Sequence, residues 1–485
     1  MSDPTSSPTP DAADAGSSAT APTEAAPAAD ATAVVAPPST SEVATKDTGA
    51  DLMTVLSSRG YRGLLVVSAV IGVPVALVAW GFLVITHELE NAVWTSLPKS
   101  LGMSQPTWWY GLIVLAVAGL LVGVTISKLP GTGGHIPAHG LGGGQPLPKE
   151  MPAIVIAAIV SLVLGAVVGP EAPLVAIGSG AVVVALHKSR VGAQPQALQL
   201  LAVAGSAAAI STIFGNPVIG AVLILEVVGF AGSQVLLVLL PAVMAAGIGA
   251  LVFTGLGDWT GFAAPTLTIP NLTSSTVTFT DLLWTVPVSI VVALLAQAAR
   301  RTGVNVAGLA TKRPVAVTTA VGVVVGASAA VYALVTGRPI TDVLFSGESA
   351  LGPLVSNPQS WATGTLLALV LFKGIAYAVS LGAFRGGPTF PALFIGAAIG
   401  MVLGSLPGFG TTAGIAVGMA AGTAAVLRLP ITSIVLVTLL LGTQALSEIP
   451  IVMVAAVVGL VTAVSLDRKD SIRPLKFREA RAGKA

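Results

Sequence analysis

Two stretches with one shared pattern decide how this chain is organised: "GPEAPLVAIGSG" at residues 169–180 and "GPTFPALFIGAA" at residues 387–398. Both read Gly-Pro-x-x-Pro-x-x-x-Ile-Gly. Two further pairs follow in the same order, "AGSAA" (204–208) with "AGTAA" (421–425), and "PVIGAVLILEVVG" (217–229) with "PITSIVLVTLLLG" (430–442). Three collinear matches at a nearly constant separation predict an internal duplication, with repeats at about 60–255 and 280–466.

The composition around these stretches indicates an all-α polytopic membrane protein. Of the 485 residues, 54% are hydrophobic and only 9% are charged, and the mean hydropathy is +0.90. Soluble domains carry about 25% charged residues. A helix that crosses the bilayer core needs about 20 apolar residues. Blocks near that length are 62–86, 108–127, 151–169, 233–255, 281–299, 315–336, 360–382 and 448–466.

Other apolar blocks are too short or too interrupted to cross a membrane alone. They are 171–187, 198–213, 216–229, 389–405, 412–427 and 430–442. Backbone that ends at membrane depth is tolerated only inside protein or beside a cavity. Broken helices in matching positions of two halves point to a transport site near the bilayer midplane.

The ends of the chain differ from its middle. Residues 1–55 are rich in Ala, Pro, Ser, Thr and Asp, which predicts a disordered tail. Residues 56–467 form the predicted transmembrane domain, and 468–485 form a basic tail. Basic residues mark cytoplasmic loops, and here they occur at Lys188/Arg190, in "ARRTGVNVAGLATKRP" and at the C-terminus. We therefore expect both termini to be cytoplasmic and the protein to lie in a bacterial plasma membrane.

The sequence argues against several other classes of protein. Cysteine is absent and the four histidines do not form H-E-x-x-H, which argues against thiolate metal sites and zinc hydrolases. We expect no enzyme activity, no cofactor and no metal. The basic residues are scattered between apolar blocks, and we expect no nucleic-acid partner.

Three Gly/Pro-rich junctions carry the predicted chemistry: "GTGGHIPAHG" (131–140), "GPEAP" (169–173) and "GGPTFP" (386–391). Each precedes an apolar run that we expect to be helical. A helix N-terminus offers free N–H groups and a partial positive charge, so it binds anions. The junctions therefore predict an anion site. The alternative is that Gly and Pro only permit close packing and helix starts.

Three charged residues fall inside apolar runs. Glu171, in the first turn of its helix, could occupy the place of an anion as a tethered blocker that protonation releases, or it could only satisfy local amides. Glu226 is either a functional intramembrane acid or a residue that fixes a helix end. Lys373 could be a pore charge, a buried pair partner or a snorkelling side chain.

Four motifs resemble those of the CLC family of voltage-gated chloride channels and proton/chloride antiporters, over about residues 60–466. The family's G-S-G-I-P looks like Gly133-Gly134-His135-Ile136-Pro137. Its G-R-E-G-P looks like Gly169-Pro170-Glu171-Ala172-Pro173. Its G-x-F-x-P looks like Gly387-Pro388-Thr389-Phe390-Pro391, and "NPVIGAVLILE" resembles the stretch that leads to the family's inner acid.

The resemblance implies an inverted-repeat fold of tilted, partly broken helices and a homodimer in which each subunit has its own anion path. Glu171 would be the gate, and backbone amides near Glu171–Ala172 and Thr389–Phe390 would hold the anion. Several family groups are missing. Gly134 replaces a serine, His135 replaces a glycine, and no tyrosine follows Tyr377.

Two further departures concern donors and protons. Pro170 replaces an arginine and, like Pro388, has no N–H to donate; Thr389 could replace one lost hydroxyl. Alignment places Glu226 on a structural acid and Val227 on the proton-transfer position.

The interpretation is a passive chloride channel, for chloride or another small monovalent anion, gated by protonation of Glu171. The alternative is a proton-coupled chloride or fluoride antiporter. A non-transporting membrane scaffold is the remote alternative.

Overall fold

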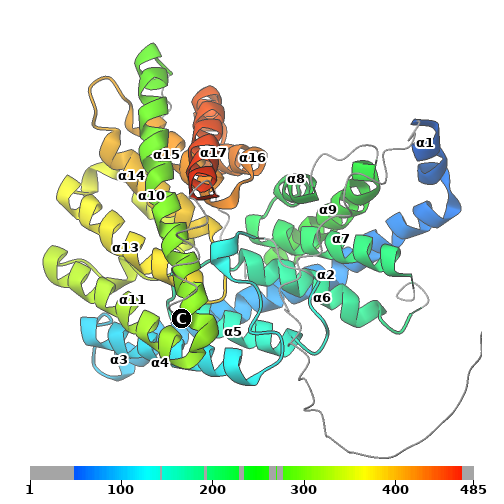
Figure 1. The fold of residues 1–485 in the computed structure, drawn as a ribbon, viewed down its shortest axis with the longest axis horizontal. Coiled ribbons are helices and arrows are strands. Elements are labelled where there is room, and N and C mark those ends of the chain that lie inside the picture. The colour runs from blue at the N-terminus through cyan, green and yellow to red at the C-terminus, as the bar shows by residue number, and fades with distance from the viewer. Residues whose placement is uncertain are drawn as a thin grey trace, which may run out of the picture. The chain divides into compact units, whose positions relative to one another are not determined.

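The computed structural model describes residues 49–141, 145–189, 194–228, 234–260, 269 and 277–471. These residues form helices without strands, apart from one isolated bridge between Gly169 and Gly387 (Figure 1). The α-helices are α1 (Gly49–Ser57), α2 (Arg59–Asn91), α3 (Leu97–Ser100), α4 (Trp108–Lys128), α5 (Met151–Val163), α6 (Glu171–Leu186), α7 (Pro195–Phe214), α8 (Pro217–Val228), α9 (Gln234–Thr260), α10 (Phe279–Lys312), α11 (Pro314–Thr336), α12 (Glu348–Ser356), α13 (Thr363–Ala383), α14 (Thr389–Leu403), α15 (Thr411–Leu427), α16 (Pro430–Leu441) and α17 (Ile449–Ser471).

In this part of the chain, eight helical stretches are long and apolar enough to cross a membrane. They are Arg59–Ser100, Trp108–Lys128, Pro195–Phe214, Val235–Leu256, Phe279–Lys312, Pro314–Thr336, Thr363–Ala383 and Leu446–Asp467. The all-helical membrane architecture predicted from the sequence is thus confirmed. All six shorter predicted runs are helical: five are helices of 10–17 residues, and the sixth, α7, is long enough to span.

Two predicted lengths are wrong. The block 151–169 was expected to span, but α5 has 13 residues and ends at Val163, because Gly165 takes the left-handed conformation with φ +89°. The block 198–213 was expected to be too short, but α7 has 20 residues. Its serine and threonine hydroxyls donate to carbonyls four residues back, as Ser211 does to Ala207, so they do not interrupt the helix.

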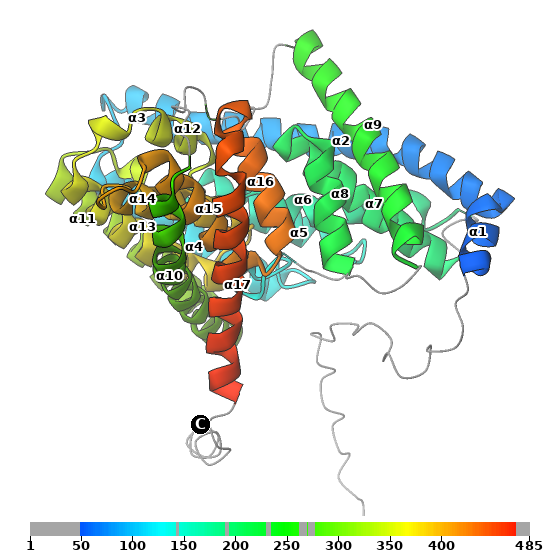
Figure 2. The same ribbon diagram turned by 90° about the horizontal axis from the view of Figure 1, so that it is seen from above.

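Glycines let the helices that carry the two motifs pack closely. α14 contains Gly396 and Gly400, and the adjacent α15 contains Gly414 and Gly418, a G-x-x-x-G pair on each helix (Figure 2). A Cβ atom at any of the four would overlap the facing helix's backbone carbonyl. Small residues of this kind allow membrane helices to approach backbone to backbone. α6 and α7 meet in the same way through Gly178 and Gly205.

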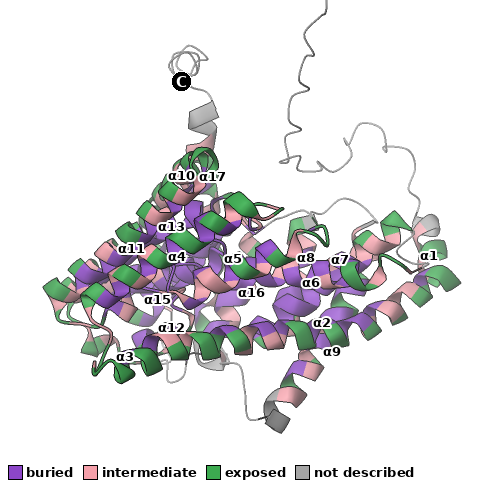
Figure 3. Ribbon diagram, turned by 90° about the horizontal axis from the view of Figure 1, so that it is seen from below, coloured by how far each residue is buried: buried purple, intermediate pink, exposed green. Residues whose placement is uncertain are grey.

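The distribution of burial fits a protein in a lipid environment. Buried residues gather where helices face one another, and exposed residues lie on outward faces (Figure 3). Those exposed residues include large apolar side chains such as Leu120, Leu251 and Leu371. Exposed apolar surface on that scale is unusual for a soluble protein and is expected where the solvent is lipid.

The predicted terminal tails lie largely outside the described residues, namely 1–48 and 472–485. The boundaries of the predicted domain and its two repeats therefore remain predictions.

Gly418→Ala should destabilise the α14–α15 contact, because the added Cβ would overlap the carbonyl oxygen of Gly396. Overpacking of this kind costs about 1–3 kcal/mol, so we expect a lower midpoint of thermal unfolding in detergent. Gly374→Ala is the matched control, since its Cβ would meet nothing within 4 Å. Equal midpoints for the two variants would contradict the close helix approach.

Candidate functional site

The two repeated motifs meet backbone to backbone. The N–H of Gly169 donates to the carbonyl oxygen of Gly387 at 2.7 Å, and the N–H of Gly387 donates to that of Gly169 at 2.5 Å. The pair forms the isolated antiparallel bridge of the structure. The next residues, Pro170 and Pro388, are the N-caps of α6 and α14. The starts of two broken helices therefore converge on one junction.

A second reciprocal pair surrounds this bridge. The N–H of Arg385 donates to Ser161 Oγ at 3.0 Å, and the N–H of Val167 donates to Ser380 Oγ at 3.4 Å. Each serine comes from one half of the chain and each N–H from the other. This exchange is what two related halves facing each other would produce. Together with the two bonds of the bridge, it holds the junction with four hydrogen bonds.

The Glu171 side chain lies inside the junction. It is 1% exposed, and its Oε1 accepts a hydrogen bond of 2.8 Å from the N–H of Phe390 in the first turn of α14. Its Oε2 has no hydrogen-bond partner, and among the described residues no cation pairs with it. The carboxylate of one half thus occupies an amide donor of the other half.

Glycine is required on both sides of this carboxylate. A Cβ atom at Gly169 or at Gly387 would overlap the carboxyl group of Glu171. Proline at position 391 has no N–H, so the first turn of α14 presents donors only at Thr389 and Phe390. The junction is therefore a narrow site with few donors, sized for a small anionic group.

Polar and aromatic side chains complete the junction. The buried Tyr377 hydroxyl donates to the carbonyl oxygen of Pro388 at 2.9 Å. The Thr389 hydroxyl is buried and has no hydrogen-bond partner. The ring of Phe390 packs on Phe214, with centroids 5.4 Å apart. Thr389 thus lies next to Phe390, whose N–H binds Glu171.

The segment Gly133–Pro137 differs from expectation. It leads into a three-residue 3-10 turn, Pro137–His139, and the next α-helix of the described chain, α5, starts at Met151. The apolar helical run expected after residues 131–140 is α5, but residues 131–140 themselves do not form its N-terminus. Successive left-handed residues, Gly131 to Gly134 with Thr132 among them, coil the chain into a loop instead.

The 131–134 loop packs against α4, α5 and the side chain of Arg385. Gly134 lies against Ile154, and Gly133 lies against Ala157, Ile126 and the Arg385 stem. The imidazole Nε2 of His135 lies 2.8 Å from the carbonyl oxygen of Gly140. Ile136 and Pro137 begin the 3-10 turn. The loop is joined to the junction through Arg385 rather than through Glu171.

Arg385 is a buried cation at the edge of the junction, 5% exposed. Its Nε and Nη2 donate to the carbonyl oxygen of Thr132 at 3.2 and 3.1 Å, and its Nη1 donates to those of Ala383 and Phe384 at 3.2 and 3.3 Å. It therefore ties the 131–134 loop to the segment that leads into the second motif.

Glu226 caps a helix of the other half. Its Oε1 accepts from the N–H of Ile431 at 2.9 Å, and its Oε2 accepts from that of Thr432 at 2.7 Å. These two N–H groups belong to the first turn of α16. Of the two interpretations, the geometry favours a residue that fixes a helix end. The next residue, Val227, is 48% exposed.

Two of the three interpretations of Lys373 do not fit the structure, and the third, a pore charge, stays a prediction. Lys373 is 1% exposed, so it does not snorkel, and among the described residues no carboxylate pairs with it. Its Nζ donates to the carbonyl oxygens of residues 342–345 at 2.9–3.2 Å and lies 4.6 Å from the centre of the Phe394 ring. It anchors the segment before α12.

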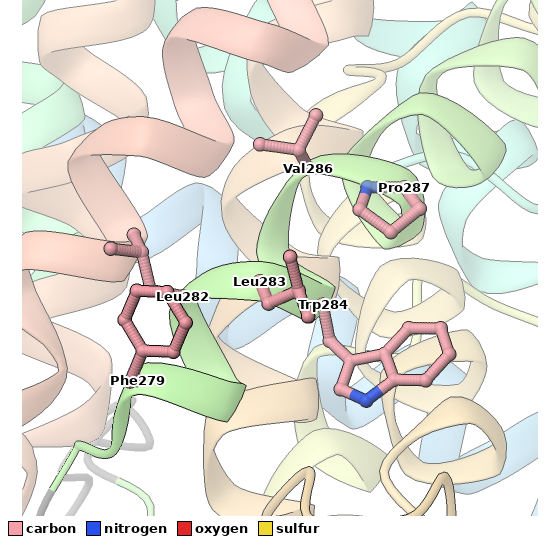
Figure 4. Close-up of a pocket in the computed structure, with 6 residues that line it drawn as sticks. All are labelled: Phe279, Leu282, Leu283, Trp284, Val286 and Pro287. Atoms are coloured by element: carbon pink, nitrogen blue, oxygen red, sulfur yellow. The ribbon is translucent and has the colours of Figure 1, made fainter.

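An apolar hollow lies on the surface of α10, lined by Phe279, Leu282, Leu283, Trp284, Val286 and Pro287 (Figure 4). Phe279 and Leu283 are exposed, and the indole N–H of Trp284 is already bound to the carbonyl oxygen of Pro407. The hollow offers no charged group to an anion and suits contact with lipid.

Sequence reasoning identified the residues of both motifs but missed Arg385, Tyr377, Ser161 and Ser380. The serines continue the internal alignment one step before the Gly-Pro pattern, at nearly the same separation, so a longer alignment would have found them. Arg385 directly precedes the second motif, but nothing in the sequence shows that its side chain folds back to Thr132.

Comparisons with known proteins show what the chain is similar to. The family described as voltage gated chloride channel matches residues 118–464. A protein of Escherichia coli (strain K12 / DH10B), named as ion-transport protein YfeO, is 30% identical over 345 residues, which are 68% of this chain and 77% of that protein. Its counterpart in Shigella boydii serotype 4 (strain Sb227) is 31% identical over the same shares.

Solved structures share the fold. A slow cyanobacterial Cl⁻/H⁺ antiporter matches with a TM-score of 0.68 and 18% identity, over 83% of this chain and 94% of that one. A CLC-type fluoride/proton antiporter matches with a TM-score of 0.62 and 16% identity, over 86% and 96%. At these identities the likeness concerns the fold alone.

Glu226→Ala should destabilise the protein by about 1–2 kcal/mol, the typical loss of an N-terminal helix cap. Two donors of α16 would lose their acceptor. We expect a lower midpoint of thermal unfolding in detergent. The midpoint of Glu226→Gln should fall between those of the wild type and Glu226→Ala. Glu88→Ala, at an exposed position of α2, is the control. An unchanged midpoint for Glu226→Ala would show that the cap does not matter.

Proposed function

This chain belongs to the voltage-gated chloride channel family of anion transport proteins, and we propose that it conducts chloride or another small monovalent anion passively through the Gly169–Gly387 junction. Glu171 is the gate. The residues that surround the path are Gly133, Gly134, His135, Ile136, Pro137, Gly169, Pro170, Ala172, Pro173, Gly387, Pro388, Thr389, Phe390 and Pro391.

One observation carries the proposal: the carboxylate of Glu171 occupies the N–H of Phe390 inside the junction. An anionic group already binds where the starts of two helices meet, so the site has the donors and the partial positive charge that a free anion needs. While the carboxylate is there, a permeating anion meets both a filled donor and a like charge. Departure of the carboxylate frees the donor.

Protonation of Glu171 opens the gate. A protonated carboxyl loses its negative charge and accepts only a neutral hydrogen bond, which is weaker than the charge-assisted bond of the carboxylate. The side chain is then held less strongly by Phe390, and a passing anion can replace it. Transport should therefore increase as the pH falls, and it should decrease as the pH rises.

Passive conduction is supported by the groups at the position expected to relay protons. Glu226 uses both carboxylate oxygens to cap α16, and valine at position 227 cannot carry a proton. Proton-coupled chloride or fluoride exchange is the second candidate. It is supported by Glu171 Oε2, a buried acceptor without a partner, which is a place where a proton can bind and travel with the gate.

The expected setting follows from the sequence. The protein would lie in a bacterial plasma membrane with both termini cytoplasmic, as the Lys/Arg distribution predicts, and would pair with a second copy of itself. Each copy would hold its own path. This arrangement uses residues 56–467 as one membrane domain.

Glu171→Gln should remove the pH dependence of anion efflux from liposomes. The neutral amide mimics the protonated gate, so we expect efflux at neutral pH to rise about tenfold or more, the equivalent of losing one charged hydrogen bond. Wild-type efflux should approach the same rate only under acid conditions. Glu88→Gln, an exposed α2 position, should behave as the wild type does.

The same liposomes distinguish the two candidates. Efflux is measured with chloride and with fluoride, each with and without a proton ionophore. Anion efflux that drives protons against their gradient would replace the channel with the exchanger. A pH response that survives Glu171→Gln would remove Glu171 from the gate, and absence of flux for every anion tested would favour the scaffold.

A further inference from the structure

We propose that Arg385 is a specificity-determining residue of the anion path, and that its guanidinium binds the transported anion directly. The inference rests on the proposed function and adds to it a cationic site that the four sequence motifs do not contain. Three observations carry it. The buried charge of Arg385 has no counter-ion among the described residues, its guanidinium has an N–H without an acceptor, and it lies close to helix N-caps that have no N–H to donate.

The charge of Arg385 is not neutralised within the described part of the chain. The side chain is 5% exposed, and among the described residues its guanidinium donates only to backbone carbonyl oxygens. A buried cation without a counter-ion carries a desolvation penalty of several kcal/mol. Carbonyl dipoles reduce that penalty but leave the net charge in place. A site in this condition favours the entry of an anion.

One donor of the guanidinium remains for that anion. Arginine has five N–H groups in a planar fork, two of them on Nη2. Nη2 makes one contact, to the carbonyl oxygen of Thr132, so its second N–H has no acceptor among the described residues. The four bonds to Thr132, Ala383 and Phe384 fix the plane of the fork, so the free N–H has a set direction and needs no reordering to bind a ligand.

The position of Arg385 matches the missing donors. Pro170 and Pro388 cap the two converging helices without an N–H, and position 134 has no hydroxyl. Arg385 lies between the 131–134 loop and the bridge at Gly387. Gly133 gives its stem room, since a Cβ there would lie 3.5 Å from Arg385 Cγ. One charged donor therefore replaces several neutral ones.

Lys373 shows why burial of a cation is not sufficient. It is also buried and bonded only to carbonyls, but an ammonium has three N–H groups, and four carbonyl oxygens surround them. No donor is left over for an anion. Lys373 therefore serves as a control: a buried cation that is also held by backbone carbonyls and should contribute stability without anion affinity.

The test measures chloride and fluoride binding to the detergent-solubilised full chain by isothermal titration calorimetry, in a Glu171→Gln background that leaves the junction open. Arg385→Met should weaken the affinity for the better-bound anion by about tenfold or more, because a charge-assisted bond is lost. Lys373→Met in the same background should change the affinity less than about twofold, while lowering the midpoint of thermal unfolding.

Arg385→Lys covers the case in which Arg385→Met does not fold. Lysine keeps the charge and loses the fixed fork, so we expect an affinity between those of the parent and Arg385→Met. If folded Arg385→Met or Arg385→Lys binds anions as tightly as the parent, the inference is wrong while the proposed function stands. If the parent Glu171→Gln protein binds no anion and passes none, the proposed function itself fails.

Discussion

The reciprocal hydrogen bonds between Gly169 and Gly387 are the constraint on which the rest of the structure depends. Backbone that leaves a helix inside a membrane needs partners, because lipid supplies none. Here the two interrupted segments satisfy each other, and Ser161 and Ser380 satisfy the next N–H groups outward. Two helix starts can then meet at depth. The glycines are also needed for a second reason, since any Cβ would displace the Glu171 carboxylate.

Three buried charges of the described residues are held by backbone groups rather than by one another. Glu171 is bound by an amide, while Lys373 and Arg385 are bound by carbonyls. By contrast, Asp467 forms ion pairs with Arg300 and Arg428, where the side chains are 20–36% exposed. An ion pair fixes a helix end well, but it neutralises its members. Buried charges that keep their field remain able to attract or exclude a mobile ion.

The sequence could predict the architecture and most of the junction because repeats and hydropathy can be identified from residue types alone. The motif at 169–180 and its second copy at 387–398 are in contact. Helix lengths were harder to predict, since the end of α5 depends on a left-handed glycine and the continuity of α7 on hydroxyls that bond within the helix. Arg385 and Tyr377 could not be placed, because their partners, Thr132 and Pro388, are chosen by the way segments fold together. The same is true of the loop after Gly131.

The prolines shared by the two motifs reduce the number of backbone N–H groups that need an acceptor inside the membrane. At the N-cap, Pro170 and Pro388 start a helix without an N–H that would have to be satisfied at depth. The carbonyl oxygen of Pro388 still accepts from Tyr377, so the cap is fixed by an acceptor. What remains at the start of α14 is the N–H of Phe390, taken by Glu171, with that of Thr389 beside it. In the proposed function, a junction with so few neutral donors would offer an anion the N–H of Phe390 and a charged group, and Arg385 is the buried cation tied to that junction.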